Sequence, residues 1–418
     1  MSAPVVLAPA EARPRVDALS RLTVALIGSG FAGGEALFLA ERCAHRLDLG
    51  DAEILDFGSA VSVQYVAADG SSVMRTARTD GVGTINCREM KYLSQVAEAT
   101  AAGTLDARGV LTALEAIDAR SGPKVWVTAA GLAVLAFAIA LQVGIGWLPA
   151  LLTAVAQIFV TLFAALLGRL GVNRLFGCAA QAILAASLIG LAYRVGAVTG
   201  IDAAAAMAVP WLLTIPLPIL IALVVDVVYN RPAGAVVRGF VVVLGGGGVA
   251  LGAYAVLSVL QALDPPVHRD ITLPTLPIWL GLVASIVGAV ANAMANGGGR
   301  DLLLPAAVIG LFTASVNQTL IHAAHFPPGW ATLVASAVLG YCCAFWSRRS
   351  PYPVSALALM GITGAILPGL TVYEGVAETV FGGDGTAAFE QAIMTGVGIG
   401  VGVAAGVLLA TRRLVRRD

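Results

Sequence analysis

The chain has 418 residues, of which 58% are hydrophobic and only 12% are charged, and its formal net charge at pH 7 is zero. Soluble globular proteins carry about a quarter charged residues, so the composition excludes that class and indicates an integral membrane protein. The balanced charge also argues against a nucleic-acid partner, because such proteins are basic. The five cysteines show neither a CxxC pattern nor zinc-ligand spacing, so we predict no metal site and no cofactor.

The charges are concentrated near the start of the chain. Residues 1–124 hold 12 Lys and Arg and 15 Asp and Glu, whereas residues 125–418 hold 13 and 10. This division predicts a soluble domain over residues 1–124, followed by a membrane domain. The first residues lack the cationic start and apolar core of a secretory signal, so we expect the soluble domain to be cytoplasmic.

The soluble domain is predicted to mix helices and strands. Residues 17–48 carry apolar side chains at spacings of three and four, which predicts a helix that is kinked or closely packed at Gly28–Gly30 and Gly33–Gly34. Two alternating runs within residues 59–79 flank Asp69-Gly70, which predicts a β-hairpin.

Two further helices complete this predicted α+β domain. Asn86 is expected to cap a helix over residues 87–101, and Thr104 or Asp106 a helix that runs to Arg120. Glu35 and Asn86 are candidates for a small polar site, although capping or surface exposure explains them better. Because the domain shows no catalytic triad or phosphate loop, we expect it to cap the cytoplasmic mouth of the membrane domain.

Ten apolar runs follow, and most reach the ~20 residues that span a bilayer core. They cover residues 125–146, 148–168, 174–194, 204–229, 235–262, 276–296, 301–323, 329–347, 353–373 and 386–411. Of the basic residues in their loops and the tail, 11 fall on one side and 2 on the other. Since basic loops stay in the cytoplasm, both termini are predicted to be cytoplasmic.

A proline-rich stretch divides the ten runs into five and five. The predicted parts are membrane half 1 (125–263), an outer linker (264–274) and membrane half 2 (275–418) with a basic tail. An odd number of spans in each half makes the halves inverted in the membrane. The predicted fold is therefore an all-α polytopic membrane protein with ten transmembrane helices as two inverted five-helix repeats, after a small α+β domain.

The fourth span of each half contains a proline break followed by a carboxylate. Shifting the chain by 152 positions aligns Pro216 with Pro368 and Asp226 with Glu378, and also aligns glycines of the two fifth spans. A break within a span is tolerated only where protein or a water-filled cavity satisfies the freed backbone groups. The paired breaks indicate a transporter built from repeats.

Charged side chains within spans are costly and mark transport pathways, although a solvated position at the interface is the alternative. The candidates for substrate or proton coupling are Asp226, Glu378 and Glu374. The helix breaks expected to line the cavity are Pro216, Pro218, Pro368 and Gly369. Supporting polar candidates, for which hydrogen bonding between helices is the alternative, are Thr214, Thr371, Asn292, Asn317 and Gln318.

The chain resembles the threonine/serine exporter family over nearly its whole length. The likeness comprises the soluble segment with its Gly-Ser-Gly, the Asp-Gly hairpin and the two sets of five spans. The most specific stretch, Met-Gly-Ile-Thr-Gly-Ala-Ile-Leu-Pro-Gly-Leu over residues 360–370, is similar to the family's Pro-Gly motif. In the first half the downstream Asp226 is kept, but Pro216-Leu-Pro218 replaces Pro-Gly.

The resemblance implies a secondary transporter in a bacterial-type plasma (inner) membrane that exports threonine and serine, coupled to protons and without a cofactor. Its partners would be the amino acid, protons and the lipid bilayer, and a homo-oligomer is compatible with this picture. Export of small dicarboxylates is an alternative within the family. The rival classes are a membrane-bound hydrolase, which needs an active site that the sequence does not show, and a passive channel or receptor.

Overall fold

The computed structural model describes residues 7–79, 81–120, 122–262, 276–362, 369–380 and 383–415. These residues form two compact units, each described by itself below. Unit 1 contains Met1–Gly122, Ala222–Phe240 and Ala344–Ala356, and unit 2 contains Pro123–Ile221, Val241–Cys343 and Leu357–Asp418. The predicted outer linker, 264–274, lies outside the described residues, and the predicted domain limits stay a prediction.

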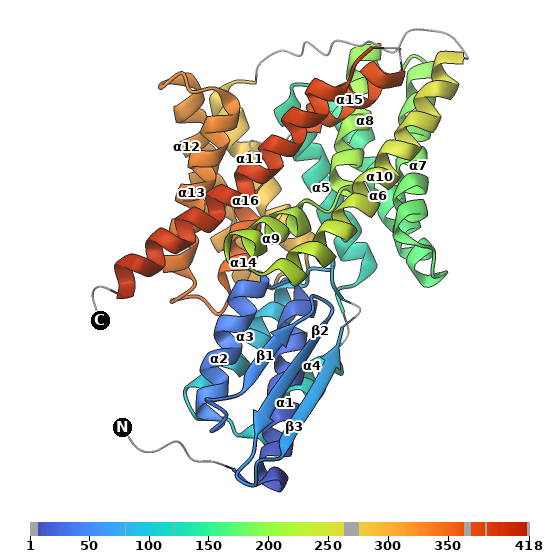
Figure 1. Cartoon of the computed structure of the whole chain (residues 1–418). Coiled ribbons are helices and arrows are strands. Elements are labelled where there is room, and N and C mark those ends of the chain that lie inside the picture. The colour runs from blue at the N-terminus through green and yellow to red at the C-terminus, as the bar shows by residue number, and fades with distance from the viewer. Residues whose placement is uncertain are drawn as a thin grey trace. The chain divides into compact units, whose positions relative to one another are not determined.

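The N-terminal part of unit 1 is a three-stranded antiparallel sheet, in the order β1-β2-β3, with four helices (Figure 1). Its elements are α1 (Pro9–Ser29), α2 (Gly33–Arg46), β1 (Glu53–Asp56), β2 (Ala60–Val66), β3 (Ser72–Arg78), α3 (Cys87–Ala101) and α4 (Ala107–Asp118). Helix α1 packs against β2 and β3 and also against α2, α3 and α4. A helix enclosed in this way must be apolar on most of its surface, which explains its many buried side chains.

Several local predictions for this domain are confirmed. The hairpin joins β2 to β3 through Asp69-Gly70, where Gly70 adopts the left-handed conformation with φ 77°. Asn86 caps α3 and Asp106 caps α4, each by accepting a backbone N–H three residues later. Short-range patterns were sufficient here because each of these structures is made by residues that are neighbours in the chain.

Two predictions for the same domain were wrong. The helix expected over residues 17–48 is two helices, because Gly30 adopts φ 115° and ends α1. Strand β1 was not predicted, since its four residues are too few for an alternating pattern. The domain therefore has three strands and four helices, in place of the two strands and three helices expected.

The rest of the chain is helical. Among the described residues, eight helices are long and apolar enough to span a membrane: α5 (Val125–Val143), α6 (Trp147–Arg169), α7 (Arg174–Arg194), α10 (Pro232–Ala262), α11 (Ile278–Ala295), α12 (Arg300–His322), α13 (Pro328–Trp346) and α16 (Thr386–Val415). Helices α8 (Gly200–Thr214) and α9 (Leu217–Val228) form a bent pair that makes a ninth candidate span. Helices α14 (Val354–Gly361) and α15 (Gly369–Val380) flank residues outside the described part, so the count of ten stays a prediction.

Glycines bring two pairs of helices in unit 2 into backbone contact. A Cβ added to Gly248 or Gly252 of α10 would lie 2.3 Å from a carbonyl oxygen of α7. A Cβ added to Gly402 or Gly406 of α16 would lie 2.5 or 2.0 Å from a carbonyl oxygen of α13. The equivalent glycines are 154 positions apart, and the carbonyl groups that they approach are 158 apart. The sequence alignment of the breaks uses a shift of 152 and pairs Gly248 with Gly400 instead.

Gly406→Ala should destabilise the protein, because the new methyl group would meet the Ala337 carbonyl oxygen of α13. Overpacking of this kind costs about 1–3 kcal/mol. The matched control is Gly398→Ala on the same helix, where nothing lies within 4 Å of the added Cβ. Thermal unfolding in detergent should show a lower Tm for Gly406→Ala alone; equal losses in both variants would contradict the packing.

Candidate functional site

The first broken span is bent by 51° between α8 and α9. Ile215 is extended, as expected for the residue before a proline, and Pro216 follows it. Thr214 supports the end of α8, since its hydroxyl donates to the Pro210 carbonyl oxygen at 2.8 Å. Pro218 is the second residue of α9, where no backbone donor is needed.

Amide side chains at the C-terminal end of α11 hold α14, the helix that begins the predicted second broken span. Asn292 Nδ2 donates to the carbonyl oxygen of Leu359, near the end of α14, at 2.9 Å. Asn296 Nδ2 donates in turn to Asn292 Oδ1 at 2.8 Å. Pro368 lies outside the described residues, whereas Gly369 is the first residue of α15. The predicted polar candidate Asn292 thus satisfies a carbonyl group at the break.

Helix α12 adds polar side chains beside the end of α14. Thr313 and Asn317 are one turn apart, and each is 1% exposed. A Cβ added to Gly361, the last residue of α14, would lie 2.9 Å from Thr313 Oγ1. Gln318 and Thr371, the two other polar candidates, are partly buried.

An aromatic stack joins α8 to α15. The rings of Trp211 on α8 and Tyr373 on α15 are 5.8 Å apart with an interplanar angle of 22°. Trp211 Nε1 donates to the Ala182 carbonyl oxygen at 3.1 Å. Tyr373 is fully buried, and its hydroxyl has no hydrogen-bond partner among the described residues. An unsatisfied buried hydroxyl is costly.

The predicted carboxylates fall into both compact units. Glu374 and Glu378 lie one turn apart on α15 in unit 2, and both are partly buried. Asp226 lies in the last turn of α9 in unit 1 and is fully buried.

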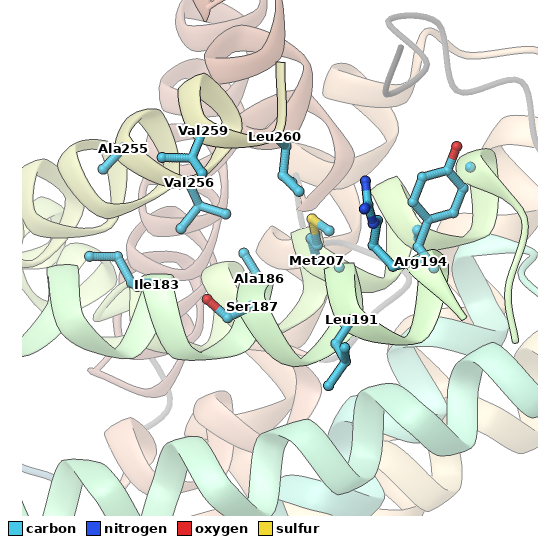
Figure 2. Close-up of a pocket in the computed structure, with 14 residues that line it drawn as sticks. Ile183, Ala186, Ser187, Leu191, Arg194, Met207, Ala255, Val256, Val259 and Leu260 are labelled. Atoms are coloured by element: carbon cyan, nitrogen blue, oxygen red, sulfur yellow. The ribbon is translucent and has the colours of Figure 1, made fainter. Parts of the chain in front are cut away.

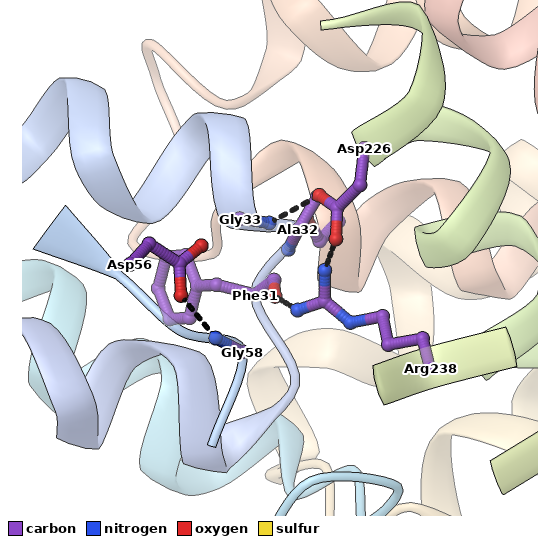
Figure 3. A network of polar contacts seen from close by, with 8 residues as sticks. Phe31, Ala32, Gly33, Asp56, Gly58, Asp226 and Arg238 are labelled. Carbon is purple, nitrogen blue, oxygen red and sulfur yellow. Dashed lines mark hydrogen bonds and ion pairs between the residues drawn. The ribbon is translucent and has the colours of Figure 1, made fainter. Parts of the chain in front are cut away.

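Asp226 is the centre of a polar network in unit 1 (Figure 3). It forms an ion pair with Arg238 of α10, which is also buried, and accepts a hydrogen bond from Gly33 N at 2.8 Å. Arg238 also donates to the Phe31 carbonyl oxygen at 2.7 Å. Nearby, Asp56 accepts from Gly58 N at 2.7 Å. A buried charge requires such compensation, and here the N-terminus of α2 and a guanidinium supply it.

Glu35, two residues after Gly33, binds the start of α14. Its carboxylate accepts from Val354 N at 2.8 Å and Ser355 N at 3.2 Å, and from the Ser355 hydroxyl. Burial raises the pKa of Glu35, and these three donors offset part of that shift. Glu35 therefore caps the start of α14, which agrees with the capping role that the sequence favoured, although the capped helix lies 319 positions later in the chain.

Sequence reasoning missed one residue of this network altogether. Arg238 was counted only as one of the 11 basic residues that indicate the cytoplasmic side. The structure shows that it is the ion-pair partner of Asp226. The available signal was its position 12 residues after Asp226, across the short turn between two apolar runs. Oppositely charged residues inside neighbouring spans tend to pair, because an isolated charge there is costly.

A cavity of about 560 Å³ lies in unit 2 between α7, α8 and α10 (Figure 2). Its walls are mostly apolar, with Met207 and Leu260 among the side chains that line it. Ser187 and Arg194 are among its few polar groups. Such a lining suits a hydrocarbon chain better than a charged or zwitterionic ligand.

Comparison with known families gives two matches. Residues 17–260 match a family described as putative threonine/serine exporter. Residues 281–412 match a second, described as Threonine/Serine exporter, ThrE. No curated protein and no solved structure matches the chain.

Arg238→Met should destabilise unit 1, because it leaves the Asp226 carboxylate buried without its cation. Removing one partner of a buried ion pair typically costs about 3–5 kcal/mol. The double variant Asp226→Asn/Arg238→Met should recover part of that loss. The control is Arg231→Met, whose exposed pair with Glu41 at 4.0 Å should contribute about 0–1 kcal/mol. Denaturant unfolding measures all three, and equal stability of the two single variants would contradict the role of the pair.

Proposed function

The chain belongs to the threonine/serine exporter family, and we propose that it exports threonine and serine from the cytoplasm, driven by the proton gradient. The family indicates an exporter-type, multi-pass membrane transporter. The observation that carries the finer proposal is the contact of the two broken spans through Trp211 and Tyr373. Broken helices place backbone N–H and C=O groups in the membrane interior, where they suit the carboxylate and ammonium of an amino acid.

The register of α5 against α11 supports an inverted repeat with ten spans. A Cβ on Gly131 would lie 2.7 Å from the backbone nitrogen of Ala295, and Gln142 Nε2 donates to Ser285 Oγ at 2.9 Å. The early residue of α5 meets the late residue of α11, so the helices are antiparallel. Gly131 and Ser285 are 154 positions apart, and Gln142 and Ala295 are 153. A shift of 153 or 154 positions therefore converts the Gly131–Ala295 contact into the Ser285–Gln142 contact. Two helices related by a two-fold axis perpendicular to both would show this reciprocal pairing.

The groups beside the breaks are mostly uncharged, which favours a zwitterion. Asn292 and Thr313 lie at the end of α14, and Thr214 lies at the end of α8. One observation favours the alternative, export of small dicarboxylates. Arg174 Nε is buried without a hydrogen-bond partner among the described residues, and lies 3.8 Å from a Cβ added to Gly245, which packs on Pro216.

Glu378 and Asp226 are the proposed proton-coupling groups, and Glu374 is a weaker candidate. Protonation of Asp226 would weaken its ion pair with Arg238 and its hydrogen bond from Gly33. Proton binding there would thus loosen the attachment of α2 to the end of α9.

We place the protein in a bacterial-type plasma (inner) membrane with both termini in the cytoplasm, because 11 basic loop and tail residues would then face inward and 2 outward. A cysteine placed at Val267 should react with an impermeant reagent in intact cells, and one placed in the tail should react only after permeabilisation. Labelling of the tail alone in intact cells would show that the orientation is opposite to the one proposed.

Reconstituted protein should export labelled threonine and serine faster when the proton gradient is imposed. Glu378→Gln keeps the shape of the side chain and removes its titration, so it should abolish proton-driven export and leave threonine exchange largely intact. Succinate serves as the competitor that tests the dicarboxylate alternative. Normal proton-dependent export by Glu378→Gln would remove this residue from the mechanism, and preferential export of succinate would replace the proposed substrate.

A further inference from the structure

The first turn of α2, residues Ala32–Glu35, contacts segments from both halves of the membrane domain within unit 1. On one side it meets the end of α9. On the other it meets the start of α14. Helices α9 and α14 each belong to one of the two broken spans, so one turn of helix touches both.

The contact with α9 depends on the close approach of two glycines. Gly33 N donates to Asp226, and a Cβ on Gly33 would lie 2.9 Å from the Asp226 carboxylate. A Cβ on Gly34 would lie 3.1 Å from the ring of Tyr229. Arg238 closes this side by binding the carbonyl oxygen of Phe31, immediately before the turn. The backbone of α2 thus lies directly against the end of α9.

The contact with α14 depends on a hydroxyl and a carboxylate. The Ser355 hydroxyl donates to Glu35 and accepts from Ala32 N at 3.1 Å. The Glu35 carboxylate also accepts from two successive backbone N–H groups, of Val354 and Ser355. These are donors that the first turn of α14 cannot satisfy within the helix.

Helix α14 is short, and both of its ends are held by other helices. It has eight residues, too few to form a stable helix without tertiary contacts. Glu35 holds Ser355 in its first turn, and Asn292 holds the carbonyl of Leu359 one turn later. The placement of α14, and with it the start of the second break, therefore depends on these two side chains.

We propose that the first turn of α2 ties α9 to α14, so that the two half-helices move together during transport, with Glu35 as the positioning residue on the α14 side. This inference rests on the proposed transport function. The groups that face Glu35 are Tyr229 and Ser355, and the Asp226–Arg238 pair lies on the other face of the same turn. Substrate need not touch Glu35; the residue acts through the backbone of α14.

The test compares Glu35→Gln with Glu41→Gln, an exposed position on the same helix, in full-length protein reconstituted in vesicles. A residue that positions the break should alter the rate of conformational exchange more than substrate binding. Glu35→Gln should therefore lower the maximal rate of threonine exchange about tenfold, with KM changed less than about twofold. Glu41→Gln should match the natural protein in both.

Ser355→Ala provides a milder second variant that removes one hydroxyl. Combined with Glu35→Gln it should lower the rate no further, because both changes break the same contact. Ser355→Thr, which keeps the hydroxyl, should restore most of the rate. The proposal would be overturned if the two substitutions lowered the exchange rate independently in the double variant. It would also be overturned if Glu35→Gln had the same maximal rate and KM as Glu41→Gln.

Hydrogen exchange separates this inference from the proposed function. The amides of Val354 and Ser355 should exchange about tenfold faster in Glu35→Gln than in Glu41→Gln, with or without substrate. If the natural protein transports neither threonine nor serine, the function proposal fails. Faster hydrogen exchange of these two amides in Glu35→Gln would still support the contact between α2 and α14. If those amides exchange equally in both variants, the tie is wrong whatever the protein transports.

Discussion

The lack of water in a bilayer core constrains the rest of this structure, because every backbone N–H and C=O group there needs a protein partner. A continuous helix meets this requirement by itself, but a broken one does not. The two breaks therefore determine which polar side chains surround them. Asn292 binds a carbonyl at the end of α14, and Pro216 and Pro218 have no donor to satisfy.

Removal from water by the protein itself explains why two carboxylates of unit 1, Asp226 and Glu35, lie at helix N-termini. Asp226 meets the first turn of α2, and Glu35 meets the first turn of α14. A helix N-terminus offers unpaired N–H groups and a partial positive charge, which compensates a carboxylate that has left water. Asp226 is the more deeply buried of the two, and it has in addition the guanidinium of Arg238.

What could be predicted from the sequence was what neighbouring residues determine. The helices over 125–143 and 174–194, the Asp69-Gly70 hairpin and the Asn86 cap follow from local hydrophobicity, turn residues and capping. The contacts that organise unit 1 join distant residues: Glu35 and Ser355 are 320 positions apart, and Gly33 and Asp226 are 193. No periodicity records such a pairing. Asp226 was singled out as a charge within a span, but its partners became visible only in three dimensions.

The two half-helices held by α2 present opposite chemistry, and this explains how one turn can bind both. In an inverted repeat, the broken span of one half ends on the side of the membrane where the broken span of the other half begins. Helix α9 ends at α2 and brings a carboxylate, Asp226, whereas α14 begins there and brings free N–H groups. The first turn of α2 offers the complement of each, an N–H at Gly33 and a carboxylate at Glu35. A single, unrepeated helix can therefore bind both half-helices of the proposed inverted repeat without being symmetric itself.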